Sequence, residues 1–228
     1  MYETLVSNPE SSWIELFEEI CTKQNLLIDP ETLYREWKER EIDFRRVRLN
    51  IEHPHKSPHF KSYEVAWKEC FDQVFEMRRL NGDSSQAAKN AIYSMGIREP
   101  FEETHAALLT LQNNWTTAVL SNADDDYLLP QIERLGINFH SILSSEMVGA
   151  YKPHPMPFES ILIKLGLLAH EVVYVGDNQF DDVKGAKGVG MRSVWINRYG
   201  KHPDSNLPSP DFEITSLTDL HKVIERWN

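Results

Sequence analysis

The first hundred residues carry apolar side chains at helical spacing. Within residues 11–23 the apolar positions fall on one face of a helix: Trp13, Leu16, Phe17, Ile20 and Cys21. The same kind of spacing recurs in three further segments, at residues 28–37, 62–75 and 83–96. Four amphipathic helices in succession are typical of a small bundle. The pattern predicts a separate helical unit over residues 10–98.

Residues at the helix starts support these boundaries. Asp29 followed by Pro30 is typical of an N-cap and the first helical position. Asp83 stands in the same place before the fourth segment. Ser12 with Glu15 three residues later indicates a capping box, which predicts that the first helix begins at Ser12.

From about residue 100 the pattern changes to short runs rich in Val and Ile that alternate with helical patterns. Five such runs predict strands, at residues 116–121, 141–145, 172–177, 192–197 and 212–215. Strand and helix in alternation predict one parallel sheet with helices on both faces. The sequence therefore predicts an α/β fold, a doubly wound parallel sheet built from residues 1–9 and 99–228.

Composition limits the partners. The chain of 228 residues has 24 Lys and Arg against 35 Asp and Glu, a net charge of −11, which argues against nucleic acid and anionic membranes as partners. No apolar run is long enough to span a bilayer, and we expect a soluble cytoplasmic protein. Cys21 and Cys70 sit in helical patterns and are expected to be reduced, buried thiols.

Polar groups follow three predicted strands or loops at one edge of the sheet, where such sheets bind ligands. In GDNQFDD, Asp177 ends a strand and Asp182 follows five residues later, as a Mg²⁺ site would require. The alternative is that these carboxylates merely start a helix. Ser121 and Lys152, each weak alone, together suit a phosphate group. Three such groups on one sheet favour a binding site.

Taken in order, the segments AVLSNADD, YKPHPMPF and VYVGDNQFDDVKGA resemble the haloacid dehalogenase superfamily of hydrolases. The resemblance implies that Ser121 and Asn122 position phosphate and that Lys152 neutralises charge. It also implies that Asp177 and Asp182 hold Mg²⁺, although Asp181 matches a shorter variant of the motif. The expected reaction is Mg²⁺-dependent hydrolysis of a small phosphate ester through a phosphoaspartate, with residues 10–98 as a four-helix cap.

The opening segment MYETLV resembles the end of the superfamily's first motif, Asp-x-Tyr-x-Thr. This match implies that Tyr2 lends its backbone carbonyl to Mg²⁺ and that Thr4 belongs to the catalytic set. The nucleophilic aspartate and the strand that carries it would then stand directly before Met1. We expect the 228 residues alone to be rearranged around that gap and inactive by this route. The plain alternative is that the segment is a frayed terminus.

Two other functions stay open. The chain could be a noncatalytic relative that binds a phosphorylated ligand or a partner protein, or it could be a haloacid dehalogenase. Dehalogenases of the superfamily have a Ser-Ser-Asn type of stretch where this chain has GDNQFDD, so Asp177 favours the phosphatase. His53, His55 and His59 are expected to form a loop rather than a metal site.

Two arginines and a tryptophan of the helical unit are the remaining candidates. We expect Arg45 and Arg46 on the surface of the bundle, and a contact of either arginine with the substrate is an alternative. Trp37 is expected in the core of the bundle.

Overall fold

The computed structural model describes residues 1–227, which form two compact units. The α/β unit contains residues Met1–Ser7, Glu99–Asn122 and the chain from Leu135 onward. The helical unit contains Asn8–Arg98 and Ala123–Arg134. Residues 123–134 were expected in the α/β core, whereas their contacts place them with the helices.

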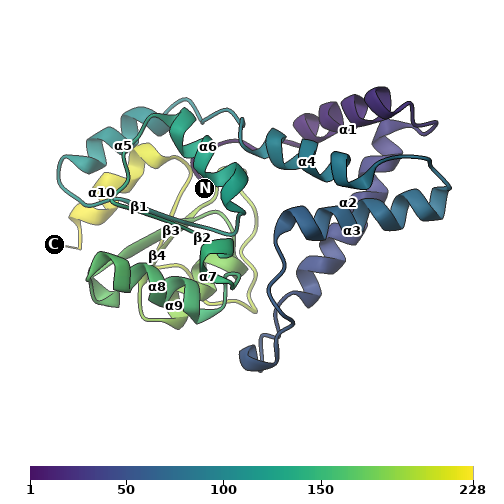
Figure 1. The fold of residues 1–228 in the computed structure, drawn as a ribbon. Helices are drawn as coiled ribbons and strands as arrows, with labels where there is room; N and C mark the ends of the chain where they lie inside the picture. Colours follow the sequence, from purple (N-terminus) through teal and green to yellow (C-terminus); the bar gives the residue numbers. More distant parts are fainter. Residues whose placement is uncertain (228) are drawn as a thin grey trace. The chain divides into compact units, whose positions relative to one another are not determined.

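Helices build this unit (Figure 1), and each of the four helices predicted from the apolar spacing is present. Its helices are α1 (Glu10–Gln24), α2 (Pro30–Val47), α3 (Tyr63–Arg78), α4 (Ser84–Met95) and most of α6 (Asp125–Leu135), with a short 3₁₀ turn, η1 (Pro54–Lys56). The N-cap at Asp29 is confirmed, because its carboxylate accepts a hydrogen bond from the Thr32 N–H. Asp83 caps α4 in the same way.

The predicted capping box at Ser12 is wrong. Helix α1 begins at Glu10, directly after an extended Pro9, so Ser12 already lies within the first turn. Pro9 lies at the N-cap with φ −68° and ψ 156°, and since proline has no backbone N–H it leaves no donor unpaired there. The start is therefore set by Pro9 rather than by a side-chain cap.

Aromatic side chains form the core of the helical unit. Trp37 is fully buried, as predicted, and its ring lies 5.3 Å from Trp13 and 5.8 Å from Trp67, centroid to centroid. Tyr127 of α6 stacks on Trp67 at 6.0 Å. Aromatic pairs of this kind add to the stabilisation that comes from buried area. Tyr127 thus explains why α6 belongs with the helical unit.

The α/β unit contains all five predicted strands, and these predictions are confirmed. They are β1 (Ala118–Ser121), β2 (Ser141–Ser144), β3 (Val173–Gly176), β4 (Arg192–Ile196) and β5 (Phe212–Ile214). The predicted α/β fold with parallel strands is confirmed, but the strands do not all pair in a single sheet. The strands form two parallel sheets, ordered β1-β2 and β3-β4-β5, because among residues 1–227 no strand lies between β1 and β3.

Helices pack on the strands from opposite faces, as the doubly wound pattern predicts. The helices of this unit are α5 (Thr104–Gln112), α7 (Ser145–Val148), α8 (Pro155–Leu165), α9 (Gly185–Gly188) and α10 (Leu220–Glu225). One apolar cluster joins Leu108 of α5 and Leu220 of α10 to Val194 of β4. A second joins Phe158 of α8 to Leu120 of β1. Short helical turns complete the unit: η2 (Ala169–Glu171), η3 (Gln179–Lys184) and η4 (Leu217–Asp219).

The opening residues are part of the α/β unit. Residues 1–6 form a tight turn in which the Leu5 N–H donates to the Met1 carbonyl at 2.7 Å. The Leu5 carbonyl accepts from the Thr104 hydroxyl at 2.7 Å, and Val6 is fully buried. Residues 1–7 are therefore held in place by hydrogen bonds and packing rather than frayed.

Cys21 and Cys70 are both free and buried, which confirms the prediction of two thiols. Over residues 1–227, no helix combines the length and the apolar character that crossing a membrane would require.

Candidate functional site

The carboxyl ends of β1 and β3 and the loop before α8 meet at Lys152. Its ammonium nitrogen Nζ lies 2.5 Å from Oδ1 of Asp182 and 2.8 Å from the hydroxyl oxygen of Tyr174. Lys152 is 6% exposed and Asp182 is 4% exposed, so this ion pair is shielded from water. A buried lysine keeps its charge only when such partners surround it.

Asn122 holds the lysine loop against the end of β1. Its side-chain oxygen accepts from the Lys152 backbone N–H at 2.7 Å, and its amide nitrogen donates to the Lys152 carbonyl at 3.1 Å. The same amide nitrogen lies 3.3 Å from Oδ2 of Asp181. Because both backbone groups of Lys152 are engaged, Asn122 determines where the lysine side chain enters the site.

The backbone at Gly176 lies very close to the Asp182 side chain, and this close approach lets Asp182 reach Lys152. It lies in η3, and its Oδ2 accepts from the Asn178 backbone N–H at 3.0 Å. A Cβ placed on Gly176 would lie 2.3 Å from Cγ of Asp182. Glycine is therefore required at position 176, because any side chain there would displace the carboxylate.

Asp177 lies beside this pair at the end of β3. Its Oδ1 accepts from the Thr4 hydroxyl at 3.0 Å, and its carbonyl accepts from the Trp195 indole N–H at 3.0 Å. Burial, and then the negative charge of Asp182, raises the pKa of Asp177 to about 6. Two carboxylates share a region that is partly closed to water, so added positive charge would be favourable there.

The same surroundings shift the pKa values of Lys152, Tyr174 and the Met1 amino group. Burial alone would lower the pKa of Lys152, but the carboxylate of Asp182 outweighs it and the pKa of Lys152 is raised. Burial raises the pKa of Tyr174, so its hydroxyl stays protonated. Burial, and then the charge of Lys152, lowers the pKa of the Met1 amino group to about 6. The start of the chain therefore lies within reach of the site's charges.

The remaining residues singled out by the sequence lie at the same edge. Ser121 ends β1 opposite Ser144 of β2 and is 4% exposed. Tyr2 lies in the turn between Met1 and Thr4. Hydrogen bonds join Thr4 to Asp177, and they join Lys152 to both Asn122 and Asp182. The charge of Asp182 acts on Asp177. Ser121 and Tyr2 adjoin these residues in sequence.

The donor set is suited to a hard cation. Asp177 and Asp182 supply carboxylate oxygens, and Mg²⁺ commonly binds through one or two carboxylates while it keeps several waters. Within residues 1–227 there is no group of three or more His, Cys, Asp or Glu side chains arranged to hold a metal. A cation here would therefore need backbone oxygens or water as well. His53, His55 and His59 form no such group either.

Two further residues support the site and were not predicted from the sequence. The Tyr174 hydroxyl contacts Lys152, and Arg198 donates from Nη2 to the Thr4 carbonyl at 2.8 Å. Arg198 also pairs with Glu103 at 2.6 Å. Signals for both were present: Tyr174 is a polar-tipped residue in an apolar strand, and Arg198 follows β4 at the carboxyl edge of the sheet.

Comparisons with known proteins give one family. Residues 48–196 match the haloacid dehalogenase-like hydrolase family. The chain is 26% identical over 191 residues to haloacetate dehalogenase H-2 of Moraxella sp. (strain B), which covers 82% of both chains. It is 32% identical over 122 residues to a glyceraldehyde 3-phosphate phosphatase of Pyrococcus furiosus, which covers 51% of this chain and 50% of the relative.

Among solved structures, the HAD-family hydrolase YfnB from Bacillus subtilis, bound to magnesium, is similar in fold. It superposes with a TM-score of 0.80 at 15% identity, covering 98% of this chain and 95% of the other. At that identity the likeness concerns the fold alone. The matched family spans most of the chain, including the strand ends that carry the site, and the chain therefore belongs to the haloacid dehalogenase-like hydrolases.

Proposed function

We propose that the protein is a Mg²⁺-dependent phosphohydrolase that acts on a small phosphate ester. The observation that carries the proposal is the buried ion pair of Lys152 and Asp182 at the carboxyl ends of β1 and β3, with the half-buried Asp177 beside it. A lysine suits the negative charge of a phosphoryl group, and two adjacent carboxylates suit a divalent cation. An uncharged substrate would require neither the buried lysine nor the two adjacent carboxylates.

Each residue takes a role in this proposal. Ser121 and Asn122 position the phosphate, and Lys152 offsets its charge. Asp177 and Asp182 hold Mg²⁺, which supplies charge stabilisation to the phosphoryl oxygens when bound.

The residues of the opening turn complete the proposed site. Thr4 orients Asp177 through its hydrogen bond, and the carbonyl of Tyr2 is the remaining oxygen ligand.

The pairing of Asp182 affects how it would hold the metal. Both of its oxygens already accept hydrogen bonds, Oδ1 from Lys152 and Oδ2 from the Asn178 N–H. Within residues 1–227, the Asp177 carboxylate accepts a side-chain hydrogen bond only on Oδ1, from the Thr4 hydroxyl. Asp177 is therefore proposed as the direct Mg²⁺ ligand. Asp182 would act through a water molecule, or directly after one of its two hydrogen bonds is released. Asp181, which contacts Asn122, is the alternative second carboxylate.

The relatives support two substrate classes. The similarity to the Pyrococcus furiosus phosphatase supports phosphate esters, although it spans only half of that protein. The similarity to the Moraxella haloacetate dehalogenase covers 82% of each chain and supports a second candidate, the hydrolysis of a haloacid. Tyr2 also fits the dehalogenase-like form of the first motif. The phosphohydrolase is preferred because dehalogenation has no need of the carboxylate at position 177.

Metal binding separates these candidates without requiring turnover. We expect the 228-residue chain to bind Mg²⁺ in calorimetric titration and Asp177→Asn to lose that binding, because an amide is a poorer ligand for a hard cation. Asp126→Asn is the matched control, since Asp126 is exposed in the first turn of α6. Equal affinity in wild type and Asp177→Asn would contradict the metal site.

Turnover requires a second comparison. The chain is assayed for phosphate release from p-nitrophenyl phosphate with Mg²⁺ or EDTA, and for halide release from 2-chloropropionate in EDTA. Mg²⁺-dependent phosphate release would support the phosphohydrolase, whereas halide release in EDTA would favour the dehalogenase. Binding of Mg²⁺ and phosphate without turnover of either substrate would favour a noncatalytic phosphate-binding relative.

A further inference from the structure

Arg198 places a nearly buried cation just beyond the carboxyl end of β4. Its side chain is 9% exposed. Nη1 donates to Oε1 of Glu103 at 2.6 Å, and Nη2 donates to the backbone carbonyl of Thr4 at 2.8 Å. The central carbon Cζ lies 3.6 Å from the centroid of the Phe101 ring. A planar guanidinium that is bonded at both ends of its fork and packed on a ring is held in one orientation.

Glu103 is the fixed end of this arrangement. Its Oε1 also accepts from the Ser216 hydroxyl at 3.2 Å. Glu103 directly precedes α5, and Ser216 directly precedes η4, so both belong to parts of the α/β unit that carry none of the proposed site residues. An ion pair that is partly shielded from water and joined by a further hydrogen bond keeps its geometry better than an exposed pair. Glu103 therefore anchors the guanidinium, and the Thr4 carbonyl is the group that the guanidinium holds.

The held carbonyl belongs to the residue whose hydroxyl binds Asp177. The Thr4 hydroxyl donates to Oδ1 of Asp177 at 3.0 Å, and Thr4 is 5% exposed. The indole N–H of Trp195 bonds to the Asp177 backbone carbonyl at 3.0 Å, so Trp195 fixes the backbone of this residue. The direction of the Asp177 carboxylate depends instead on Thr4. Because the carbonyl and the hydroxyl belong to the same residue, a shift of Thr4 away from Arg198 would also move the hydroxyl.

We propose that Arg198 is a positioning residue for the metal site: it binds the Thr4 carbonyl, keeps the Thr4 hydroxyl against Asp177 and thereby raises the affinity for Mg²⁺. Removing a residue that orients a metal ligand typically weakens metal binding by about 10- to 100-fold. The inference rests on the proposed Mg²⁺ site at Asp177. It assigns the role to the donor that reaches Thr4, since the pairing with Glu103 alone would stabilise the fold without acting on the site.

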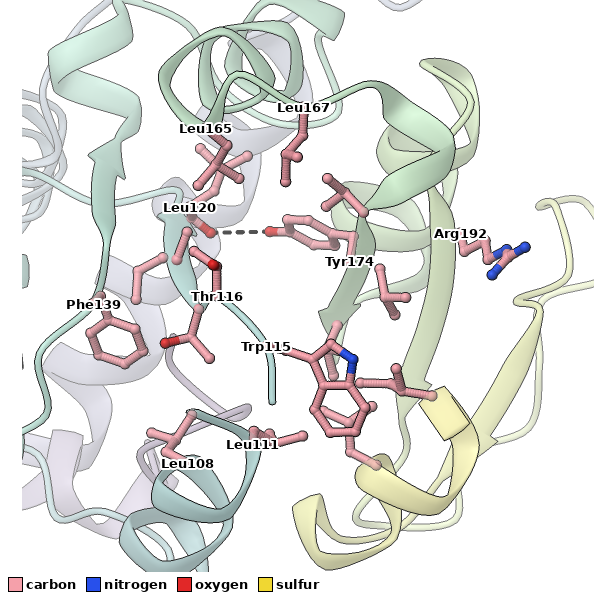
Figure 2. Close-up of a pocket in the computed structure, with 18 of the residues that line it drawn as sticks. Leu108, Leu111, Trp115, Thr116, Leu120, Phe139, Leu165, Leu167, Tyr174 and Arg192 are labelled. Carbon is pink, nitrogen blue, oxygen red and sulfur yellow. Dashed lines mark hydrogen bonds between the residues drawn. The ribbon is translucent and has the colours of Figure 1, made fainter. Parts of the chain in front are cut away.

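Arg198→Lys separates the two contacts. A lysine ammonium still pairs with Glu103, but it lacks the planar fork that spans Glu103 and Thr4 together. We expect a midpoint of urea unfolding close to that of the wild type and, in calorimetric titration, Mg²⁺ binding that is weaker by about tenfold. Arg192→Lys is the matched control, because Arg192 lies at the amino end of the same strand, beside the pocket shown in Figure 2. It should keep the wild-type affinity.

A double-mutant cycle tests the route through Thr4. Thr4→Val removes the hydroxyl but keeps the carbonyl that Arg198 binds, and it should itself weaken Mg²⁺ binding by about tenfold. In that background Arg198→Lys should have little further effect, because the hydroxyl that transmits the change is gone. Equal fold losses from Arg198→Lys in both backgrounds would mean that Arg198 does not act through the hydroxyl, and would overturn the proposal.

A measurement without metal separates this inference from the proposed function. The carboxyl carbon of Asp177 is followed by NMR in isotopically labelled protein at about pH 8, where carboxylates are ionised, and its signal is assigned from its absence in Asp177→Asn. Arg198→Lys should shift this signal towards its position in Thr4→Val. Glu103→Gln, which removes the charge of the anchor, is a second variant and should shift the signal in the same direction.

The outcomes are distinct. If the wild type binds no Mg²⁺, the proposed metal site fails, and the Asp177 signal alone then decides whether Arg198 positions the carboxylate. An Asp177 signal that is the same in the wild type, Arg198→Lys and Glu103→Gln would overturn the proposal, whatever the Mg²⁺ affinities are. Wild-type Mg²⁺ affinity in a folded Arg198→Lys would overturn it as well.

Discussion

The hydroxyl of Tyr174 on β3 donates a hydrogen bond of 3.0 Å to the Leu120 carbonyl on β1. The same hydroxyl accepts from Lys152 at 2.8 Å. One side chain therefore links two sheets that share no backbone pairing and connects both to the buried ion pair. A tyrosine hydroxyl can do this because it both donates and accepts.

Removing this hydroxyl should destabilise the α/β unit. Tyr174→Phe leaves the Leu120 carbonyl and one Lys152 donor without their partner, and we expect a loss of about 1–3 kcal/mol in the free energy of unfolding. Urea denaturation measures it. Tyr93→Phe, at a tyrosine that is 70% exposed, should change stability by less than about 0.5 kcal/mol. Equal stability of the two variants would show that the bridge contributes nothing.

The ion pair of Lys152 and Asp182 should behave as a coupled unit. Lys152→Met leaves a buried carboxylate without its charge partner, and we expect a loss of about 3–5 kcal/mol. The double variant Lys152→Met with Asp182→Leu should recover part of that loss, because replacing both charges by apolar groups removes the unpaired charge. A double-mutant cycle by chemical denaturation checks this expectation. Simple additivity of the two single effects would contradict it.

Asp124 should be important for the helical unit. It is 2% exposed, and its two carboxylate oxygens accept from the backbone N–H groups of Tyr63 at 2.7 Å and Glu64 at 2.8 Å, at the start of α3. Asp124→Ala removes both bonds, and we expect a loss of about 2 kcal/mol or more. Asp126→Ala, in the exposed first turn of α6, is the control. In thermal unfolding followed by circular dichroism, Asp124→Ala should unfold at a clearly lower temperature than Asp126→Ala.

Acid should weaken the helical unit through Glu41. Glu41 is 1% exposed, and although burial alone would raise its pKa, Arg45 and Lys38 outweigh burial and the pKa of Glu41 is lowered. A carboxyl whose folded pKa lies below the unfolded value of about 4.3 contributes stability above that value. This contribution is lost as the pH falls through the lowered pKa.

The acid effect is measured by urea unfolding between about pH 7 and about pH 3. Glu41→Gln should be less stable than the wild type at neutral pH, and its stability should fall less steeply in acid. Glu39→Gln, at an exposed neighbour on the same helix, should keep the wild-type slope. Parallel curves for Glu41→Gln and the wild type would show that Glu41 is not the responsible group.

The sequence by itself determined the elements and the chemistry at their ends. Helical spacing around Trp37 and the N-caps at Asp29 and Asp83 are local features, because a helix turn and its cap involve residues only three or four positions apart. The polar residues at the ends of β1 and β3 were also predictable from the sequence, since parallel strands place their carboxyl ends at one edge of the sheet.

Only the tertiary structure decided which groups meet. Lys152 and Asp182 lie 30 residues apart, and Asp124 reaches Tyr63 across 61 residues. The split of the strands into two sheets is also a tertiary result, because an unpaired edge depends on which strand lies next to it and not on the residues within the strand. Local periodicity reports burial and conformation, whereas partner choice depends on how distant surfaces pack, and that information is not contained in any short segment.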